Sequence, residues 1–168
     1  MSTATKTRTK VSLRKATPDD LMFINGIIET SVMSWQLPER VKRLTLPNYR
    51  YKAEHFESLT LYLATGKDSM DVLGVLAIGE AAEEDVPNGQ RATLVHGVYV
   101  DPINHREGIG KKLVAHAMKA AKKAGMDGLV VTAQPDSIAF FEAIGFARCE
   151  MPKDDEAEFR NVFWKPAA

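Results

Sequence analysis

A strand, a glycine-containing loop and a long helix follow one another between residues 98 and 125, and this order limits the folds that the chain can adopt. The stretch begins with Val98-Tyr-Val100, passes through Gly108-Ile-Gly110 and ends its helical part at Gly125. Glycines let the backbone turn tightly, and the first N–H groups of a helix have no helical partners and carry partial positive charge. The stretch therefore predicts a cradle for a diphosphate group.

The elements around this cradle predict a mixed sheet. Strands are expected over Thr93–Val100 and Gly128–Ala133, on either side of a helix over Gly108–Ala124, and such a crossover requires a parallel pair. The other expected strands are Val11–Arg14, Leu59–Ala64, Val72–Ile78, Phe146–Cys149 and Phe159–Trp164. The other expected helices run from Thr17 to Ser31, inside the loop Trp35–Asn48, over Tyr51–Ser58 and over Ser137–Ile144. The fold class is thus α/β in the broad sense, an α+β domain with about seven mostly antiparallel strands, one parallel βαβ crossover and about four helices.

The composition is that of one globular domain, expected over residues 11–168, because the chain has 168 residues and no net charge. Residues 1–10 are basic and contain no acid, which is typical of a disordered tail. The zero net charge argues against nucleic-acid binding, and no apolar run is long enough for a signal peptide or a membrane span. Cys149 is the single cysteine, and the histidines lack metal-ligand spacing, so we expect a cytoplasmic protein without a disulfide or a metal.

Two common phosphate-binding motifs do not fit the cradle. A dinucleotide fold places GxGxxG after its first strand, whereas this chain has GxG late in the sequence. A Walker loop needs GxxxxGK[ST], and no glycine here is followed by Lys and then Ser or Thr. The diphosphate therefore belongs to another carrier.

Two motifs give the chain a resemblance to the GNAT superfamily of acyl-CoA-dependent N-acyltransferases. The first is a strand ending V-x-V and then [Q/R]-x-x-G-x-[G/A], here Val98-Tyr-Val100 and His105-Arg-Glu-Gly108-Ile-Gly110. The second is close to A-x-x-F-Y-x-x-x-G-F, here Ser137-Ile-Ala-Phe140-Phe141-Glu-Ala-Ile-Gly145-Phe146. With the opening strand and helix and the antiparallel strands, the resemblance spans residues 11–164.

The resemblance implies that acetyl-CoA is the co-substrate. The diphosphate would lie on backbone N–H groups between Arg106 and Lys111, and the pantetheine arm beside a strand that splays away from Gly128–Ala133. An N–H near Val98 would polarise the thioester carbonyl. The residues implied in CoA binding are Val98, Tyr99, Val100, His105, Arg106, Glu107, Gly108, Ile109, Gly110, Lys111, Gln134, Ser137 and Phe141.

Three positions depart from the family pattern. His105 stands where Gln or Arg is usual, and Gln134 stands where Asn is common. Phe141 stands where many members have a Tyr that protonates the departing thiolate, and Phe has no proton to give. Three explanations stay open: the thiolate leaves unaided because its pKa is only ~8.5, Tyr99 or a water protonates it, or the protein binds acyl-CoA without fast chemistry.

A histidine or glutamate is expected to take the proton from the acceptor amine. His96 is the first candidate because it lies in the strand that leads to the acyl site, although a structural role, as a buried histidine bonded to a neighbouring strand or loop, is an equal alternative. Glu80, at the end of the preceding strand, is the second candidate. Regular alternation along the strand predicts two faces, with His96, Val98 and Val100 on one and Val95, Gly97 and Tyr99 on the other.

The segment 31–51 corresponds to the wall of the acceptor pocket in this superfamily, and Trp35, Tyr49 and Tyr51 could line that pocket. The basic residues between 40 and 43 favour an acidic acceptor, whereas the acidic run Glu80–Asp85 favours a cationic amine. The two signals conflict, so the identity of the acceptor stays open.

The expected function is transfer of an acetyl group from acetyl-CoA to the primary amine of a small molecule, by direct attack in a ternary complex. Two alternatives stay open: a non-catalytic acyl-CoA sensor, which Phe141 suggests, and an acetyltransferase that acts on a protein or peptide amine. The expected partners are the amine and acetyl-CoA, without nucleic acid or membrane, and the chain could form a homodimer.

Overall fold

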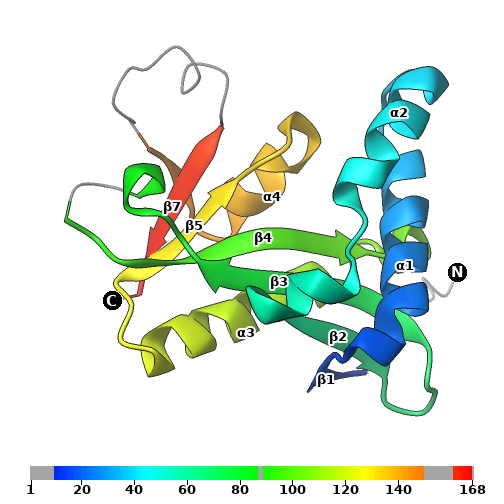
Figure 1. Ribbon diagram of the computed structural model, residues 1–168, viewed down its shortest axis with the longest axis horizontal. Helices are drawn as coiled ribbons and strands as arrows, with labels where there is room; N and C mark the ends of the chain where they lie inside the picture. Colours follow the sequence, from blue (N-terminus) through cyan, green and yellow to red (C-terminus); the bar gives the residue numbers. More distant parts are fainter. Residues whose placement is uncertain (1–9, 87–88, 150–160, 168) are drawn as a thin grey trace, which may run out of the picture.

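One mixed sheet forms the centre of the computed structural model, which describes residues 10–86, 89–149 and 161–167 (Figure 1). The sheet has seven strands in the order β1-β2-β3-β4-β5-β7-β6, and β4 and β5 are parallel within the described ranges. The strands are β1 (Val11–Lys15), β2 (Thr60–Gly66), β3 (Val72–Glu80), β4 (Ala92–Val100), β5 (Gly128–Thr132), β6 (Ala147–Arg148) and β7 (Val162–Pro166). The helices are α1 (Leu21–Met33), α2 (Glu39–Tyr49), α3 (Ile109–Lys123) and α4 (Ile138–Ala143). The expected fold class, with its β4–α3–β5 crossover, is confirmed.

Helices cover both faces of the sheet, and each face has its own core. Ile24 and Ile28 of α1 pack with residues of α2 and the sheet on one face, while Leu113 and Ala117 of α3 pack on the other. Phe141 of α4 belongs to the same hydrophobic core as Leu113 and Ala117 of α3, so α3 and α4 cover the same face of the sheet. Figure 1 shows α1 and α2 side by side at one end of the sheet and α3 beneath it. We call these two sides the α1 face and the α3 face.

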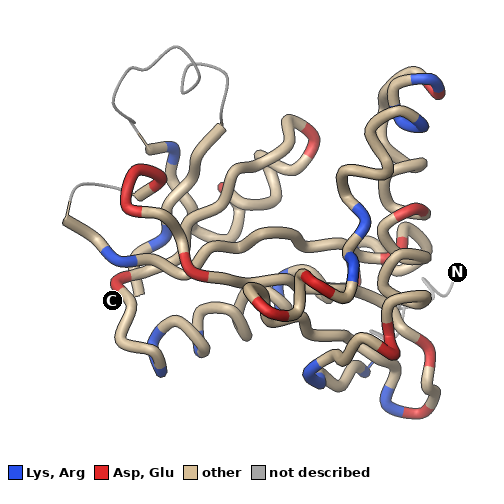
Figure 2. Tube along the Cα trace, viewed as in Figure 1, with Lys and Arg blue, Asp and Glu red and all other residues tan. Residues whose placement is uncertain are grey.

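The ends of α1 and α3 follow from local sequence. Before α1, Asp20 accepts a hydrogen bond from the Thr17 N–H (2.9 Å) and pairs with Arg14 (2.8 Å), which fixes the entry to the helix. At the end of α3, Gly125 has φ of 74°, and the N–H of Met126 donates to Ala121 O (2.9 Å). This left-handed turn is the stop that glycine favours. Figure 2 shows the lysines of α3 along the helix and the acidic residues gathered at η3 (Glu83–Asp85).

Two helical predictions need correction. Tyr51–Ser58 is not a helix, since it contains only the 3-10 turn η2 (Ala53–Glu57). The short helix expected inside Trp35–Asn48 is an eleven-residue helix, α2, that contains Pro47. Proline removes one helical hydrogen bond, and because Pro47 lies near the end of α2, packing of the buried Leu46 on the α1 core offsets the loss.

A β-bulge in β4 changes which residues share a face. Ala77 of β3 pairs with Gly97, but Ile78 pairs with Val95, so His96 is an extra residue without a partner on β3. The predicted alternation is therefore wrong. Val95 shares the α3 face with Val98 and Val100, whereas His96, Gly97 and Tyr99 lie on the α1 face.

Strands β4 and β5 pair only at their beginnings. The parallel register joins Ala92 to Gly128, Thr93 to Leu129 and Leu94 to Val130, and it extends no further among the described residues. Beyond Leu94, β4 continues to pair with β3, and β5 continues to pair with β7. The second half of β4 therefore has one free edge, and the expected splay from β5 is present.

None of the helices among the described residues is long and apolar enough to cross a membrane. Most of the tail expected over residues 1–10 lies outside the described ranges, as does the predicted beginning of the last strand at residue 159. The described part of that strand runs from Val162 to Pro166.

Candidate functional site

The free edge of β4 presents backbone groups in the gap toward β5. The Asp101 N–H donates to Leu73 O (2.9 Å), and antiparallel pairs alternate between bonded and non-bonded positions. It follows that Gly97 and Tyr99 bond to β3, while the N–H and C=O of Val98 and Val100 point to the free edge. This edge can accept an extended chain as a further strand would.

The two ends of this edge are not equivalent. Val100 O already accepts hydrogen bonds from Ser31 Oγ (3.0 Å) and from the ring Nε2–H of His105 (3.1 Å). A carbonyl oxygen has two lone pairs, so both are engaged. The N–H and C=O of Val98 and the N–H of Val100 are therefore the groups left for a ligand in the gap.

The loop between β4 and α3 has the conformation of an anion-binding turn. Arg106 and Gly108 have φ of 66° and 81°, and a left-handed conformation at a non-glycine residue is uncommon. Glu107, between them, is buried and accepts a hydrogen bond from Asn104 Nδ2 (3.1 Å). His105, at the position that departs from the family pattern, ties the loop to the end of β4. Successive N–H groups in such turns form a concave site for anions.

Helix α3 begins at this loop and adds its own donors. The Lys112 N–H donates to Gly108 O (3.1 Å), which begins the hydrogen-bond pattern of the helix. The N–H groups of Ile109, Gly110 and Lys111 come before this bond, so the helix itself gives them no acceptor. A Cβ on Gly110 would lie 3.1 Å from Phe140 Cζ, which shows how closely α4 approaches this helix start. Lys111 and Lys112 are exposed there. The helix start therefore combines free N–H groups with two exposed lysines, and both favour an anion.

The residues of the second motif lie on the other side of the gap, after β5. Gln134 is exposed, and its carbonyl accepts a hydrogen bond from Ser137 Oγ (2.9 Å). Phe141 is 4% exposed and packs edge-on between Phe140 and Phe146, with ring centroids 5.0 and 5.2 Å apart. Phe141 thus takes part in the core that joins α4 to α3.

His96 lies on the α1 face and is hydrogen-bonded to Tyr51. The Tyr51 hydroxyl is 2.7 Å from His96 Nδ1, so Nε2 is the ring nitrogen left for another group. The residue as a whole is exposed, but one side of its ring packs on Tyr51. Burial of that side lowers the pKa of His96 below its ordinary value, and nearby His55 lowers it further. A neutral imidazole is the form that can accept a proton.

Aromatic side chains surround His96 on the α1 face. Tyr51 is 3% exposed, and a Cβ on Gly97 would lie 2.7 Å from Tyr99 Cε2 and 2.8 Å from the Tyr51 hydroxyl. Burial raises the pKa of Tyr99, and so does nearby Tyr49. Burial also raises the pKa of Tyr51, with a smaller effect from Tyr99. Burial raises the pKa of Tyr49 as well, so the phenols of Tyr49, Tyr51 and Tyr99 all stay protonated at neutral pH.

Trp35 extends this aromatic group, since its ring lies edge-on to Tyr49 with centroids 5.2 Å apart. The structure thus brings together most of the predicted catalytic and acceptor residues, namely His96, Tyr99, Trp35, Tyr49 and Tyr51. Glu80 is separate from them. It pairs with Thr93, and its side chain lines a small recess with Arg91 and Met126 that includes none of these aromatic residues.

Three residues of the site carried no signal in the sequence. Asn25 fixes the backbone of Tyr51, Ser31 holds Val100 O, and His55 lies edge-on to Tyr51 with ring centroids 5.6 Å apart. Asn25 and Ser31 act across 26 and 69 positions, and although His55 is a near neighbour of Tyr51 in the sequence, neither periodicity nor spacing relates the three residues to β4. Lys42, one of the basic residues that favoured an acidic acceptor, is buried and donates to Met33 O (2.8 Å), so it is not available to such an acceptor.

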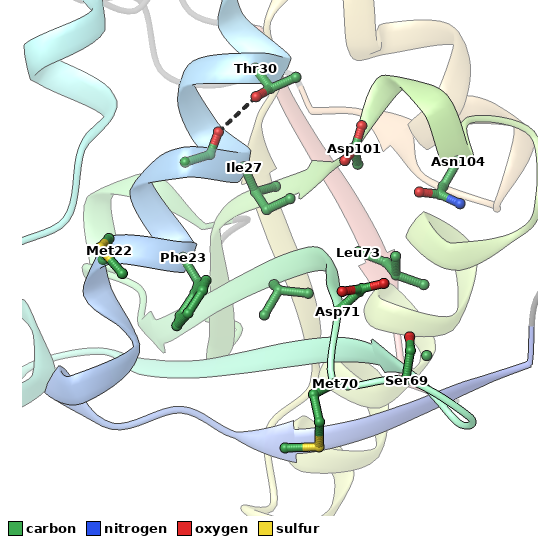
Figure 3. A pocket seen from close by; sticks show the side chains of 13 residues that line it. Met22, Phe23, Ile27, Thr30, Ser69, Met70, Asp71, Leu73, Asp101 and Asn104 are labelled. Carbon is green, nitrogen blue, oxygen red and sulfur yellow. Dashed lines mark hydrogen bonds between the residues drawn. The ribbon is translucent and has the colours of Figure 1, made fainter.

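A separate groove of about 720 Å³ lies between α1 and the β2–β3 turn (Figure 3). Figure 3 shows Met22 and Phe23 of α1, Met70 of the turn, and the carboxylates of Asp71 and Asp101 around it. Two carboxylates disfavour a phosphate group there. The groove is thus a poor place for a CoA diphosphate.

Within the described residues, no group of three or more His, Cys, Asp or Glu side chains is arranged to hold a metal ion. Cys149 is a free thiol with a pKa raised by burial, which makes it a poor nucleophile. The chemistry available at this site is therefore that of His96, the tyrosines and the backbone donors.

Comparisons with known proteins agree with this geometry. A family model described as acetyltransferase (GNAT) family matches residues 29–146. No match was found among curated proteins. The chain is similar to PaiA N-acetyltransferase from Thermoplasma acidophilum in complex with coenzyme A, with a TM-score of 0.73 and 15% identity over 94% of this chain and 99% of that one.

Two further solved structures are similar over almost their whole length. AtaTR bound with AcCoA has a TM-score of 0.61 and 19% identity over 94% of this chain and 93% of that one. The KacTA–DNA complex has a TM-score of 0.59 and 18% identity over 94% of each chain. At these identities the solved structures show the fold, whereas the family model shows the relationship.

Proposed function

Because the chain belongs to the GNAT family of acetyltransferases, we propose that it transfers the acetyl group of acetyl-CoA to the primary amine of a small molecule. The observation that carries the proposal is the splay of β4 from β5. It leaves the Val98 N–H on an open edge, with the start of α3 at one end of the gap and His96 on the α1 face. The acetyl donor and the amine can thus meet at β4, each from its own face of the sheet.

Acetyl-CoA would enter from the α3 face. Its diphosphate would bind the N–H groups from Arg106 to Lys111, where the loop conformation and the helix dipole both favour an anion. The pantetheine arm would pair with the open N–H and C=O of Val98. The Val98 N–H could then stabilise negative charge on the thioester oxygen during attack.

His96 would act as the general base. The amine nitrogen attacks the thioester carbon, a C–N bond forms and the C–S bond breaks, while the amine proton moves to His96 Nε2. The lowered pKa of His96 keeps the ring neutral and ready to accept this proton near neutral pH. Glu80 is not part of this mechanism, because its side chain lines a different recess.

The CoA thiolate would leave without a proton donor from the protein. Phe141 has no proton to give, and it is buried between two other Phe rings. Burial raises the pKa of Tyr99, whereas a thiol has a pKa of ~8.5, so the thiolate is too weak a base to take the phenol proton. The thiolate instead takes a proton from solvent.

The aromatic group favours an amine acceptor. Trp35, Tyr49 and Tyr99 belong to the same core cluster as Tyr51, which contacts His96. Aromatic ring faces attract a protonated amine by cation–π interactions before it loses its first proton to solvent. The loss of Lys42 to a structural role weakens the case for an acidic acceptor. The identity of the amine stays open, and a cytoplasmic location and a homodimer stay predictions.

A CoA-release assay over free amines and peptides tests the proposal. We expect thiol release with at least one small amine, and a loss of on the order of 10²-fold or more in His96→Gln with acetyl-CoA affinity unchanged. Phe141→Tyr restores the residue that many family members have at this position, so the resemblance implies that it should be tolerated. Tight acetyl-CoA binding without turnover above hydrolysis would favour the sensor, to which Phe141 points, and turnover on peptides alone would favour a protein acceptor.

A further inference from the structure

Tyr51 contacts His96 from a distant part of the chain. The hydroxyl oxygen lies 2.7 Å from His96 Nδ1, although the two residues are 45 positions apart. The bond is short for a neutral N···O pair, and the phenol is shielded because Tyr51 is only 3% exposed. The contact therefore holds the imidazole ring in one orientation, with Nε2 away from Tyr51.

Asn25 of α1 fixes the backbone of Tyr51 in turn. Its Nδ2 donates to Tyr51 O (3.0 Å), and its Oδ1 accepts from the Tyr51 N–H (2.9 Å). One side-chain amide thus satisfies both backbone groups of Tyr51, as a neighbouring strand would. The segment after α2 is thereby held against α1, and the position of the hydroxyl is set by the helix rather than by a loop alone.

We propose, on the basis of the role given to His96 above, that Tyr51 is the positioning residue of the general base. In the working tautomer His96 carries its hydrogen on Nδ1 and donates it to the Tyr51 oxygen, which leaves the Nε2 lone pair for the amine. When the amine proton arrives at Nε2, the Nδ1–H bond to Tyr51 stays in place, and solvent later removes the proton. Tyr51 itself neither gains nor loses a proton.

The surroundings of His96 fit a neutral hydrogen-bond acceptor at Nδ1. The groups that face its ring are the hydroxyl of Tyr51 and the imidazole of His55, and Tyr99 lies next to Tyr51. Of the described carboxylates, none forms an ion pair with His96. A carboxylate at this position would raise the pKa of the base, whereas a phenol orients the ring and leaves it neutral.

The inference is tested in Tyr51→Phe, which keeps the buried ring and removes only the oxygen. Tyr62→Phe is the matched control, because Tyr62 packs edge-on to His116 on the α3 face, with centroids 4.4 Å apart. Histidine ¹⁵N NMR of the free protein reports the tautomer, and kcat, KM and their pH profiles report the reaction. Thermal unfolding checks that both variants are folded.

We expect the Nδ1–H tautomer in the native protein and a shift to Nε2–H in Tyr51→Phe. We also expect kcat to fall on the order of tenfold, with KM for acetyl-CoA unchanged, while Tyr62→Phe behaves as the native protein. A native Nε2–H tautomer, or a Tyr51→Phe enzyme with native tautomer, kcat and pH profile, overturns the positioning role. Absence of transfer in the native protein overturns the proposed reaction instead, whatever the tautomer.

Discussion

Gly97→Ala adds one methyl group beside the Tyr51 hydroxyl that contacts His96. The new Cβ would lie 2.7 Å from Tyr99 Cε2 and 2.8 Å from the Tyr51 hydroxyl, both closer than van der Waals contact. Tyr51 is buried and Tyr99 is half-buried in the same core, so neither ring is free to move aside. Both contacts are too short to remain, so the Tyr51 hydroxyl has to shift and the 2.7 Å bond to His96 is lost or lengthened.

The magnitude follows from overpacking and from the lost hydrogen bond. Forcing a methyl group into a packed site costs about 1–3 kcal/mol, and the bond adds about 1 kcal/mol. For a chain of 168 residues we expect the Tm to fall by roughly 5–15 °C. Acetyl transfer should fall further than stability predicts, because the same shift misplaces His96.

Gly26→Ala is the matched control. Gly26 lies inside α1, and a Cβ there would have no neighbouring heavy atom within 4 Å. Alanine is the better helix former by about 0.5–1 kcal/mol, so the same substitution should here raise the Tm by a few degrees and leave transfer unchanged. Differential scanning fluorimetry and CoA release measure both variants. A Gly97→Ala protein with native Tm and native transfer would show that Tyr51 does not lie over Gly97.

Other perturbations have equally definite outcomes. His55→Gln removes a group that lowers the pKa of His96, so the acid limb of the pH–rate profile should move to higher pH, and an unmoved limb would contradict their coupling. Phe141→Ala removes a buried ring and should cost about 3–5 kcal/mol in chemical denaturation, whereas a near-native midpoint would place this residue outside the core. The hydrogen bond from Arg14 lowers the pKa of Asp20, so its stabilisation is present above the ordinary aspartate pKa and is lost as the pH falls through the lowered value. Asp20→Asn should therefore destabilise slightly at pH 7 and not at strongly acidic pH, and equal effects at both would refute the pairing.

The crossover and the glycine-containing loop were accessible from the sequence because their signals are local. The loop does turn tightly, with Gly108 in the left-handed conformation, and Gly125 ends α3 as predicted. The segment between these two glycines has apolar residues on one side only, and this pattern specifies both the helix and the face that it buries. Spacing within some twenty residues was enough.

The site on the α1 face was accessible only in part. His96, Tyr99 and Tyr51 were identified as separate candidates, but the hydrogen bond between Tyr51 and His96 joins residues 45 positions apart. Nothing in residue spacing relates them. The same holds for Asn25, whose amide bonds the Tyr51 backbone across 26 positions. Tertiary packing decides such contacts, and a single sequence without relatives does not reveal it.

The β-bulge links the misassigned face to the function. In a regular strand His96 and Val98 would share the α3 face, so the base would lie behind the sheet, away from the aromatic group. The extra residue at position 96 turns His96 to the α1 face while Val98 keeps its N–H on the free edge. In the proposed reaction the acceptor and the thioester arrive from opposite faces, and this strand would offer His96 to the acceptor and the Val98 N–H to the thioester. Gly97 fits that proposal, since a Cβ at this position would lie 2.8 Å from the Tyr51 hydroxyl that contacts His96.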